Sequence, residues 1–216
     1  MVLAALTNAL KLVKKDLKST KIVLSGVGAA GTAVARLLVA KGAQNIIGFD
    51  KDGLVFEDKG AEDPMRKWFV TNCSPGSFRG DIHEAMKDAD VFIGVSAPNV
   101  LTEDDIKSMA KNGIVFALAN PDPEIDPALA RKHAAVVATG RSDQPNQINN
   151  VLAFPGIFRG LLDAHITKIT DKMLVLAAEA IASCVSDEQL NANFIVPSVF
   201  DLNVVQKVAA AVKKSS

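Results

Sequence analysis

The chain has 216 residues, 49% of them hydrophobic, which is enough to bury a sizeable core without disulfides. Its 24 basic residues balance 24 acidic residues, so it lacks the excess positive charge that binds nucleic acid or an anionic membrane surface. No apolar run reaches the roughly 20 residues that cross a bilayer, and we expect neither nucleic acid nor a membrane as a partner.

The first 20 residues are predicted to form a leading helix. Apolar side chains recur at helical spacing over residues 3–17, which indicates a helix packed on a neighbour. No Ser, Thr or Asp precedes its first turn as an N-cap, so we expect the helix to be cut rather than begun at Met1. The segment lacks a signal-peptide cleavage site, and Cys73 and Cys184 are isolated from each other; both features favour the cytoplasm.

Residues 21–150 alternate short apolar strands with helices. Strands are predicted at 22–24, 46–49, 91–95, 114–118 and 135–138, and helices at 30–40, up to about 68, 103–111 and 127–132. The charged stretch 57–63 is expected to be solvated. Apolar strands separated by helices are typical of a parallel sheet covered on both faces. The predicted fold is α/β, a doubly wound parallel sheet of the Rossmann type with flanking N- and C-terminal helices.

Residues 151–216 are predicted to form the C-terminal helices. The stretch 157–185 is rich in Ala, Leu and Ile, and a second helix is expected at about 203–213, behind Pro197. We expect this helical tail to fold back on the sheet, so that residues 1–216 form one domain.

The strongest local signal lies between the first predicted strand and the helix that follows it. Gly26, Gly28 and Gly31 form the pattern G-x-G-x-x-G, and Ala29 and Ala30 open the helix. The first glycine permits a tight turn, the second lets a pyrophosphate approach the backbone, and the third lets helix and strand pack closely. The helix N-terminus then offers free N–H groups to the phosphates. The motif predicts a dinucleotide-binding site.

Asp50 closes the second predicted strand, 19 residues after Gly31. A carboxylate at this place can accept hydrogen bonds from a ribose diol. The next residue, Lys51, could instead bind a 2′-phosphate, so the choice between NAD and NADP stays open, with Asp50 favouring NAD. The run Asp-Lys-Asp-Gly (50–53) is also compatible with an ordinary turn at the end of a strand.

Three further strand ends, at 94–98, 117–121 and 138–143, carry small or polar residues. Ligands bind at this edge of doubly wound sheets, and small side chains there let a cofactor lie against the backbone. Each segment alone is also compatible with a plain turn. Together with the glycine turn, Asp50 and Lys51, the residues predicted to contact the cofactor are Val95, Ser96, Ala97, Ala119 and Asn120.

Four longer segments carry a more specific signal. They are Asp-Val-Phe-Ile-Gly-Val-Ser (90–96), Phe-Ala-Leu-Ala-Asn-Pro (116–121), Ala-Thr-Gly-Arg-Ser-Asp (138–143) and Gln-Ile-Asn-Asn-Val-Leu-Ala-Phe-Pro-Gly-Ile-Phe-Arg-Gly (147–160). They resemble the C-terminal domain of short bacterial-type malic enzymes. The resemblance covers essentially the whole chain in order, as far as Pro-Ser-x-Phe-Asp at 197–201. The Asn-Asn-x-x-x-Phe-Pro-Gly run is hard to explain as generic Rossmann sequence.

This resemblance implies an enzyme that oxidatively decarboxylates malate to pyruvate and CO₂, with NAD or NADP, with Mg or Mn, and as a homodimer at full length. In the family, the asparagine of the Asn-Pro motif and the second asparagine of the Asn-Asn pair bind the substrate; they match Asn120 and Asn150. A carboxamide suits this task because it donates to a carboxylate without adding charge. Asn149 is left open between a substrate role and a role in the turn before Phe154.

The resemblance also implies that the reacting groups lie elsewhere. In the family, the base lysine and the acid tyrosine belong to an N-terminal domain, and the metal ligands to that domain and to the segment just before the first helix here. We expect that domain to be absent from this chain, which has no tyrosine and only three separated histidines. We therefore predict no catalytic residue and no metal ligand here, and dinucleotide binding without turnover.

Two other interpretations stay open. A stand-alone dinucleotide-binding module, acting as a sensor or an inactive partner, would also show a cut first helix and no tyrosine. The Rossmann domain of a related amino or hydroxy acid dehydrogenase would leave the motifs around Asn120 and Asn150 unexplained.

Overall fold

The computed structural model describes residues 1–57, 63–73 and 75–215, and within them the sheet has six strands in the order β3-β2-β1-β4-β5-β6. The parallel strands are β1 (Lys21–Ser25), β2 (Asn45–Asp50), β4 (Val91–Gly94), β5 (Ile114–Ala117) and β6 (Val136–Thr139). The short β3 (Gly53–Leu54), which the sequence analysis did not predict, pairs antiparallel with β2 at the edge. The predicted doubly wound sheet is confirmed, and its strand order reverses between β1 and β4, where such sheets bind ligands.

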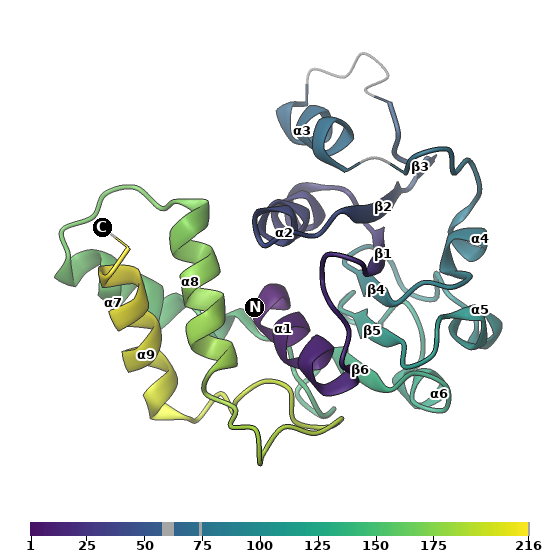
Figure 1. Ribbon diagram of the computed structural model, residues 1–216. Coiled ribbons are helices and arrows are strands. Elements are labelled where there is room, and N and C mark those ends of the chain that lie inside the picture. The colour runs from purple at the N-terminus through teal and green to yellow at the C-terminus, as the bar shows by residue number, and fades with distance from the viewer. Residues whose placement is uncertain (58–62, 74, 216) are drawn as a thin grey trace.

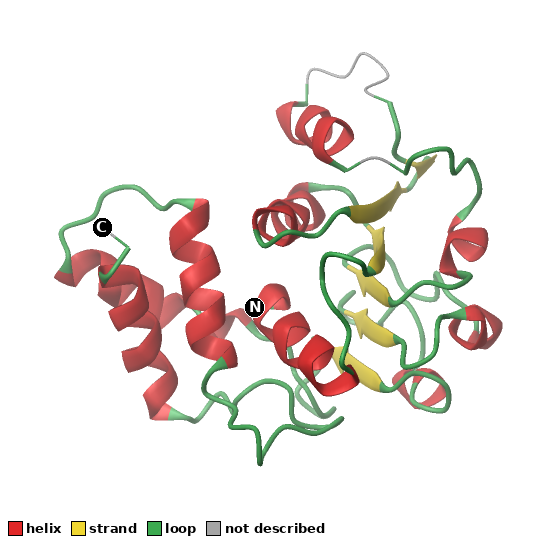
Figure 2. Cartoon of the chain, viewed as in Figure 1, coloured by secondary structure: helices red, strands yellow, loops and turns green. Residues whose placement is uncertain are grey.

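Helices cover both faces of the sheet (Figures 1 and 2). One face carries α4 (Ile82–Met86), α5 (Glu103–Ser108) and α6 (Pro127–Ala130), and the other carries α1 (Val2–Val13) and α2 (Ala29–Ala40), with α3 (Pro64–Asn72) packed beside α2. Alternate residues along each strand point to opposite faces of the sheet. Phe92 and Val115 join the core under α4, α5 and α6, whereas Ile93 and Phe116 join the core under α1 and α2. The period of two along each strand thus builds two separate cores.

The leading helix is shorter than the sequence predicts. It ends at Val13 because Lys14 adopts a left-handed conformation, with φ 57°, and the N–H of Lys15 donates to the carbonyl of Leu10 at 3.0 Å. Leu17, which the periodicity places on the apolar face of the helix, lies half-buried in the turn that follows.

The C-terminal tail forms an outer helical layer. The predicted stretch 157–185 is two helices, α7 (Phe154–Asp163) and α8 (Asp171–Ala182), since His165 adopts φ 53° and Thr170 caps α8 by accepting from the N–H of Met173. The last helix is α9 (Leu202–Lys213). α8 packs against α1 and α2, and α9 packs against α7 and α8. The tail was expected to fold back on the sheet itself. It lies chiefly on the helices that cover the sheet.

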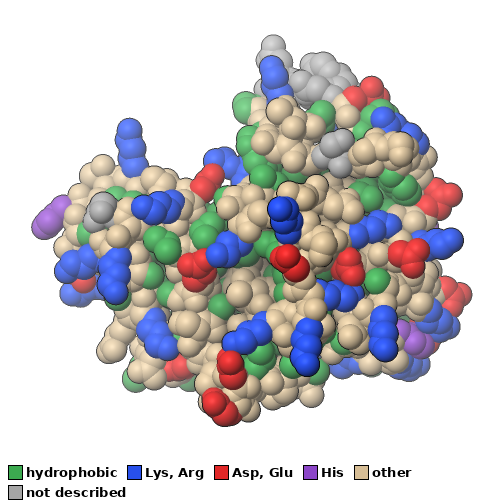
Figure 3. Space-filling view, viewed as in Figure 1, with side chains coloured by type: hydrophobic (Ala, Val, Ile, Leu, Met, Phe, Trp, Pro, Cys, Tyr) green, Lys and Arg blue, Asp and Glu red, His purple; other side chains and the backbone are tan. Residues whose placement is uncertain are grey.

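Charged side chains of both signs are spread over the molecular surface. On the face shown in Figure 3, Lys and Arg side chains are interspersed with Asp and Glu. Of the stretch expected to be solvated, Glu57 and Asp63 are exposed, while Asp58 and Glu62 lie outside the described residues. No helix in the described ranges combines the length and apolar character of a membrane span.

The contact between α7 and α9 is so close that it excludes a side chain at Gly160. An alanine in a helix interior is ordinarily better than glycine by about 1 kcal/mol. Here a Cβ would lie 2.7 Å from the carbonyl oxygen of Ala209. We expect Gly160→Ala to lower the free energy of unfolding by about 1–3 kcal/mol in urea titrations. Gly140→Ala is the control, because its Cβ would make only a 3.7 Å contact. A Gly160→Ala protein as stable as the parent would contradict this packing.

Candidate functional site

The turn between β1 and α2 is packed too tightly for side chains at two of its three glycines. Gly26 has φ +100°, and a Cβ there would lie 2.7 Å from the carbonyl oxygen of Val95. A Cβ at Gly31 would lie 1.9 Å from the carbonyl oxygen of Gly26. Gly28 differs, because it is exposed and its Cβ would meet nothing within 4 Å. The turn is therefore closed at Gly26 and Gly31 and open toward solvent at Gly28.

α2 begins at this turn with an unblocked N-terminus. Its N-cap is Gly28, none of the side chains that the structure describes caps it, and its first turn contains no acidic residue. Ala29 and Ala30 are exposed. The first N–H groups of a helix have no partner within the helix, and the helix dipole adds partial positive charge to them. This end of α2 is suited to bind the oxygens of an anion through the backbone alone.

A cavity of about 820 Å³ lies beside the turn, where β1, β2 and β4 end. Six of the predicted cofactor-binding residues line it: Gly26, Gly28, Asp50, Lys51, Ser96 and Ala97. The same cavity is lined by Arg66 from α3 and by His83 from α4. The structure thus brings the glycine turn, the end of β2 and the loop after β4 around one hollow.

A second cavity, of about 380 Å³, contains the predicted substrate residue Asn150. Ala30 and Val95, both predicted to contact the cofactor, line it as well, together with Leu118 and Gly140. Of the other predicted residues, Asn120 is exposed three residues beyond the end of β5. Among the described residues that line the two cavities, four predicted residues are missing: Ala29, Gly31, Ala119 and Asn120.

Asn149, whose role the sequence left open, has a structural role as a helix cap. Its side-chain oxygen accepts from the N–H of Val151 at 3.0 Å and caps the short 3-10 helix η1 (Asn150–Leu152). This contact fixes the chain just before α7.

Asp50 is held by contacts at both carboxylate oxygens. Oδ1 accepts from the N–H of Asp52 at 2.8 Å, and Oδ2 forms an ion pair with the guanidinium of Arg66. The two paired side chains are only 17% and 14% exposed, respectively. No motif in the sequence points to Arg66, which α3 brings to the end of β2 from 16 residues further along the chain.

Glu124 is a second group that the sequence analysis missed. It is fully buried, and its carboxylate accepts from the N–H of Ser96 at 2.9 Å and from the N–H of Ala119 at 3.0 Å. The Ser96 hydroxyl lies 2.8 Å from that of Ser25, so the loops after β1, β4 and β5 form one hydrogen-bonded group. Gly94 leaves the space for this carboxylate, because a Cβ there would lie 2.4 Å from Oε1 of Glu124.

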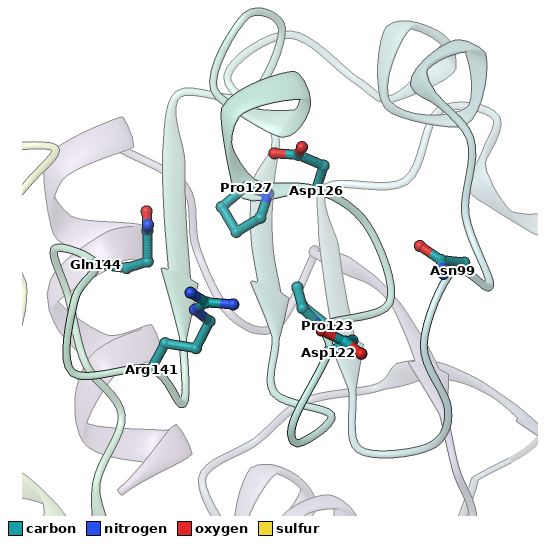
Figure 4. Close-up of a pocket in the computed structure, with 7 residues that line it drawn as sticks. All are labelled: Asn99, Asp122, Pro123, Asp126, Pro127, Arg141 and Gln144. Carbon is teal, nitrogen blue, oxygen red and sulfur yellow. The ribbon is translucent and has the colours of Figure 1, made fainter.

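A third hollow, of about 380 Å³, lies among the loops that follow β4, β5 and β6 (Figure 4). Arg141 and Gln144 line one side of it and Asn99 the opposite side. Hydrogen bonds of 2.7 and 2.8 Å from Arg141 lower the pKa of the Asp143 carboxyl to about 2. None of the predicted cofactor or substrate residues lines this hollow in the described part of the chain, and we assign it no role.

The described residues around these cavities offer few groups for acid, base or metal chemistry. His83 Nδ1 lies 2.9 Å from Oδ2 of Asp105. Cys73 is not among the described residues that line these cavities, and burial raises the pKa of its thiol to about 12, so it stays protonated at neutral pH. Within the described ranges, no group of three or more His, Cys, Asp or Glu residues could hold a metal ion. The arrangement supports binding of a ligand that carries phosphate and a diol.

Comparison with known proteins gives a consistent answer over the full sequence. Residues 1–216 match the family described as "Malic enzyme, NAD binding domain". An NAD-dependent malic enzyme of Geobacillus stearothermophilus is 50% identical over 216 residues, which are 100% of this chain and 45% of that enzyme. An NADP-dependent malic enzyme of Escherichia coli is 38% identical over 99% of this chain and 30% of its own length. The chain thus spans half or less of these relatives.

Solved structures agree with the sequence matches. A malic enzyme from Pyrococcus horikoshii superposes with a TM-score of 0.91 at 41% identity, covering 99% of this chain and 52% of that one. An NAD-dependent malic enzyme from Thermotoga maritima gives a TM-score of 0.90 at 42% identity, covering 98% and 56%.

Glu124→Gln tests the buried carboxylate. The new amide keeps the shape but turns an NH₂ group toward a backbone N–H that has no other acceptor among the contacts above. We expect a loss of about 1–3 kcal/mol in the free energy of unfolding, measured in urea. Asp122→Asn, an exposed change in the same loop, should alter stability by less than about 0.5 kcal/mol. Equal stability of the two variants would show that Glu124 does not hold the loops together.

Proposed function

The chain belongs to the malic enzyme family, as its NAD-binding domain, and on this premise we propose that it is the dinucleotide-binding part of an enzyme that converts malate to pyruvate and CO₂. The observation that carries the proposal is the open backbone at Gly28, at the N-terminus of α2, beside a cavity lined by Asp50. A helix end suited to an anion would bind the pyrophosphate, and a carboxylate suited to a diol would bind the ribose, as a dinucleotide requires.

The cofactor is NAD or NADP, and when bound it accepts a hydride from the substrate. The N–H groups at Gly28, Ala29 and Ala30 would hold the pyrophosphate, since none of the described side chains caps that end of α2. Asp50 would accept hydrogen bonds from the adenosine ribose, and Lys51 lies next to it at the cavity wall. Relatives with both nucleotide preferences are similar to this chain, so similarity alone does not choose between them.

Malate or pyruvate would be held by Asn120 and Asn150. The support for Asn150 is its place in a cavity shared with Ala30 and Val95, next to the α2 end of the dinucleotide site. A carboxamide can donate to the substrate carboxylate while its oxygen is held by another donor. For Asn120 the support is its exposed position just beyond the end of β5.

The chain alone is proposed to bind dinucleotide without turnover. Oxidative decarboxylation needs a base for the hydroxyl proton, an acid for the enol and a divalent cation to polarise the forming carbonyl. We propose that these groups, including the ligands of Mg or Mn, belong to the part of the full-length enzyme that this chain does not match. The homodimer and the cytoplasmic location stay predictions.

Gly28→Ala tests the dinucleotide site. A Cβ at this position meets no atom of the described residues within 4 Å, so folding should be unchanged, but it would occupy the space through which the pyrophosphate is proposed to reach the helix. Calorimetric titration with NAD and NADP should show binding to the parent chain and binding weaker by about tenfold or more in the variant. Ala40→Val, at the far end of α2, is the matched control and should bind like the parent. Unchanged affinity in Gly28→Ala would place the ligand elsewhere.

Turnover is tested directly with the same polypeptide. Malate, NAD or NADP, and Mg or Mn are mixed with the chain, and reduced nicotinamide is followed by absorbance. We expect no formation of reduced nicotinamide above the blank. The same sample should bind dinucleotide in the calorimeter. Robust reduction would contradict the placement of the reacting groups outside this chain.

A further inference from the structure

His83 lines the main cavity but belongs neither to the glycine turn nor to the end of a strand. It lies in the first turn of α4, and half of its side-chain surface is exposed. Two half-buried apolar residues, Ile82 from α4 and Val100 from the loop after β4, line the same cavity. A ring with two polar nitrogens thus lies beside apolar side chains at a wall to which the proposed function assigns no task.

The His83 ring is held by Asp105, whose side chain is only 8% exposed. Nδ1 of His83 lies 3.0 Å from Oδ1 and 2.9 Å from Oδ2 of this carboxylate. Oδ2 also accepts from the N–H and from the hydroxyl of Thr102, at 2.7 and 2.8 Å, within the capping box that begins α5. The start of α5 therefore fixes the carboxylate, and the carboxylate fixes the ring on α4.

This contact also determines the tautomer of the neutral His83 ring. A carboxylate accepts hydrogen bonds and donates none, so the proton of the neutral imidazole lies on Nδ1. None of the described residues forms a hydrogen bond with Nε2. Nε2 is therefore left as a hydrogen-bond acceptor on a side chain that lines the cavity.

The rest of the site limits which part of a dinucleotide would meet this acceptor. The pyrophosphate is proposed at the N-terminus of α2, the adenosine ribose at Asp50, and the nicotinamide toward the second cavity, which contains Asn150. The wall formed by α4 and the loop after β4 is left for the adenine base. Ile82 and Val100 suit this ligand, because flat ring systems bind against apolar side chains beside a few polar groups.

Purine bases differ at position 6 in a way that a hydrogen-bond acceptor distinguishes. Adenine carries an amino group there, which donates, whereas guanine and hypoxanthine carry a carbonyl oxygen, which accepts. Nε2 of His83 can pair with the amino group, but a carbonyl would leave two acceptors facing each other. A site built to bond one donor discriminates strongly against an analogue that lacks it.

We propose that His83, held by Asp105, selects adenine as the base of the bound dinucleotide. Nε2 of His83 accepts a hydrogen bond from the 6-amino group, while Ile82 and Val100 contact the ring. Asp105 is a positioning residue, because it keeps the ring proton on Nδ1. The inference rests on the proposed dinucleotide function and adds to it a base specificity and the atom that reads the base.

The test compares NAD with nicotinamide hypoxanthine dinucleotide, which has a carbonyl in place of the 6-amino group, by calorimetric titration of the 216-residue chain. The parent should bind NAD about tenfold more tightly, because one hydrogen bond is exchanged for two facing acceptors. His83→Phe keeps a flat ring but removes the acceptor, and the two affinities should then agree within about twofold. If the parent prefers NADP, then NADP and its hypoxanthine analogue are compared instead.

Asp105→Asn tests the positioning role through the same ratio of affinities. The N–H of Thr102 can only donate, so the amide oxygen should take the place of Oδ2 and the amide NH₂ the place of Oδ1. That NH₂ group would donate to Nδ1 of His83 and move the ring proton to Nε2. The preference should then shift to the hypoxanthine dinucleotide, whereas a merely structural role would weaken both ligands equally. A variant that keeps the parent ratio overturns the role of Asp105.

Asp81→Asn is the matched control. Asp81 caps α4 and lines the same cavity, so its carboxylate is a rival acceptor for the 6-amino group. Asparagine can keep the cap by accepting from the N–H of Glu84. Its ratio of affinities should stay within about twofold of the parent ratio. Thermal unfolding monitors each variant, and His83→Ala replaces His83→Phe if the phenylalanine protein does not fold.

The outcomes separate the proposed function from the base specificity. A folded parent that binds neither dinucleotide overturns the proposed function, and this inference with it. A parent that binds both dinucleotides equally overturns the inference alone. A preference for NAD that survives the loss of His83, or that disappears in Asp81→Asn, also overturns it, since another group would then read the base.

Discussion

Close packing of Gly31 on the backbone of Gly26 fixes where α2 begins relative to β1. A single Cβ at Gly31 would penetrate the carbonyl oxygen of Gly26, and one at Gly26 would penetrate that of Val95. The first turn, the start of α2 and the end of β4 are therefore held at van der Waals contact. Because Gly28 lies between these two contacts and has open space before it in the described part of the chain, a ligand can reach the backbone at the N-terminus of α2.

The buried carboxylate of Glu124 links the ends of β4 and β5. Its oxygens accept hydrogen bonds from backbone N–H groups of the loops after β4 and β5. These bonds offset the free-energy cost of burying a charged group. One side chain therefore fixes the positions of the loops that carry Ser96, Ala97 and Ala119. A rigid edge of this kind reduces the conformational entropy lost when a ligand orders it.

Much of the fold followed from local patterns. Buried parallel strands are apolar throughout, so the five long strands were visible, as was the glycine turn between strand and helix. Leu17 was misplaced because a left-handed residue at Lys14 ends the helix, and no Gly or Pro marks that point. Arg66 and Glu124 were not predicted as site residues, for a different reason. Both look like solvated charges in the sequence, and only tertiary packing places one against Asp50 and buries the other among backbone donors.

A dinucleotide bound at the glycine turn would contact the backbone around Gly28 first. Backbone amide chemical shifts, recorded by NMR as NAD is added to the isotope-labelled 216-residue chain, measure that location residue by residue. The largest changes should fall on Gly26, Gly28 and Ala29, followed by Asp52 and Ala97. Changes confined to the hollow around Asn99 and Arg141, or to the outer helices α7 and α9, would contradict the account.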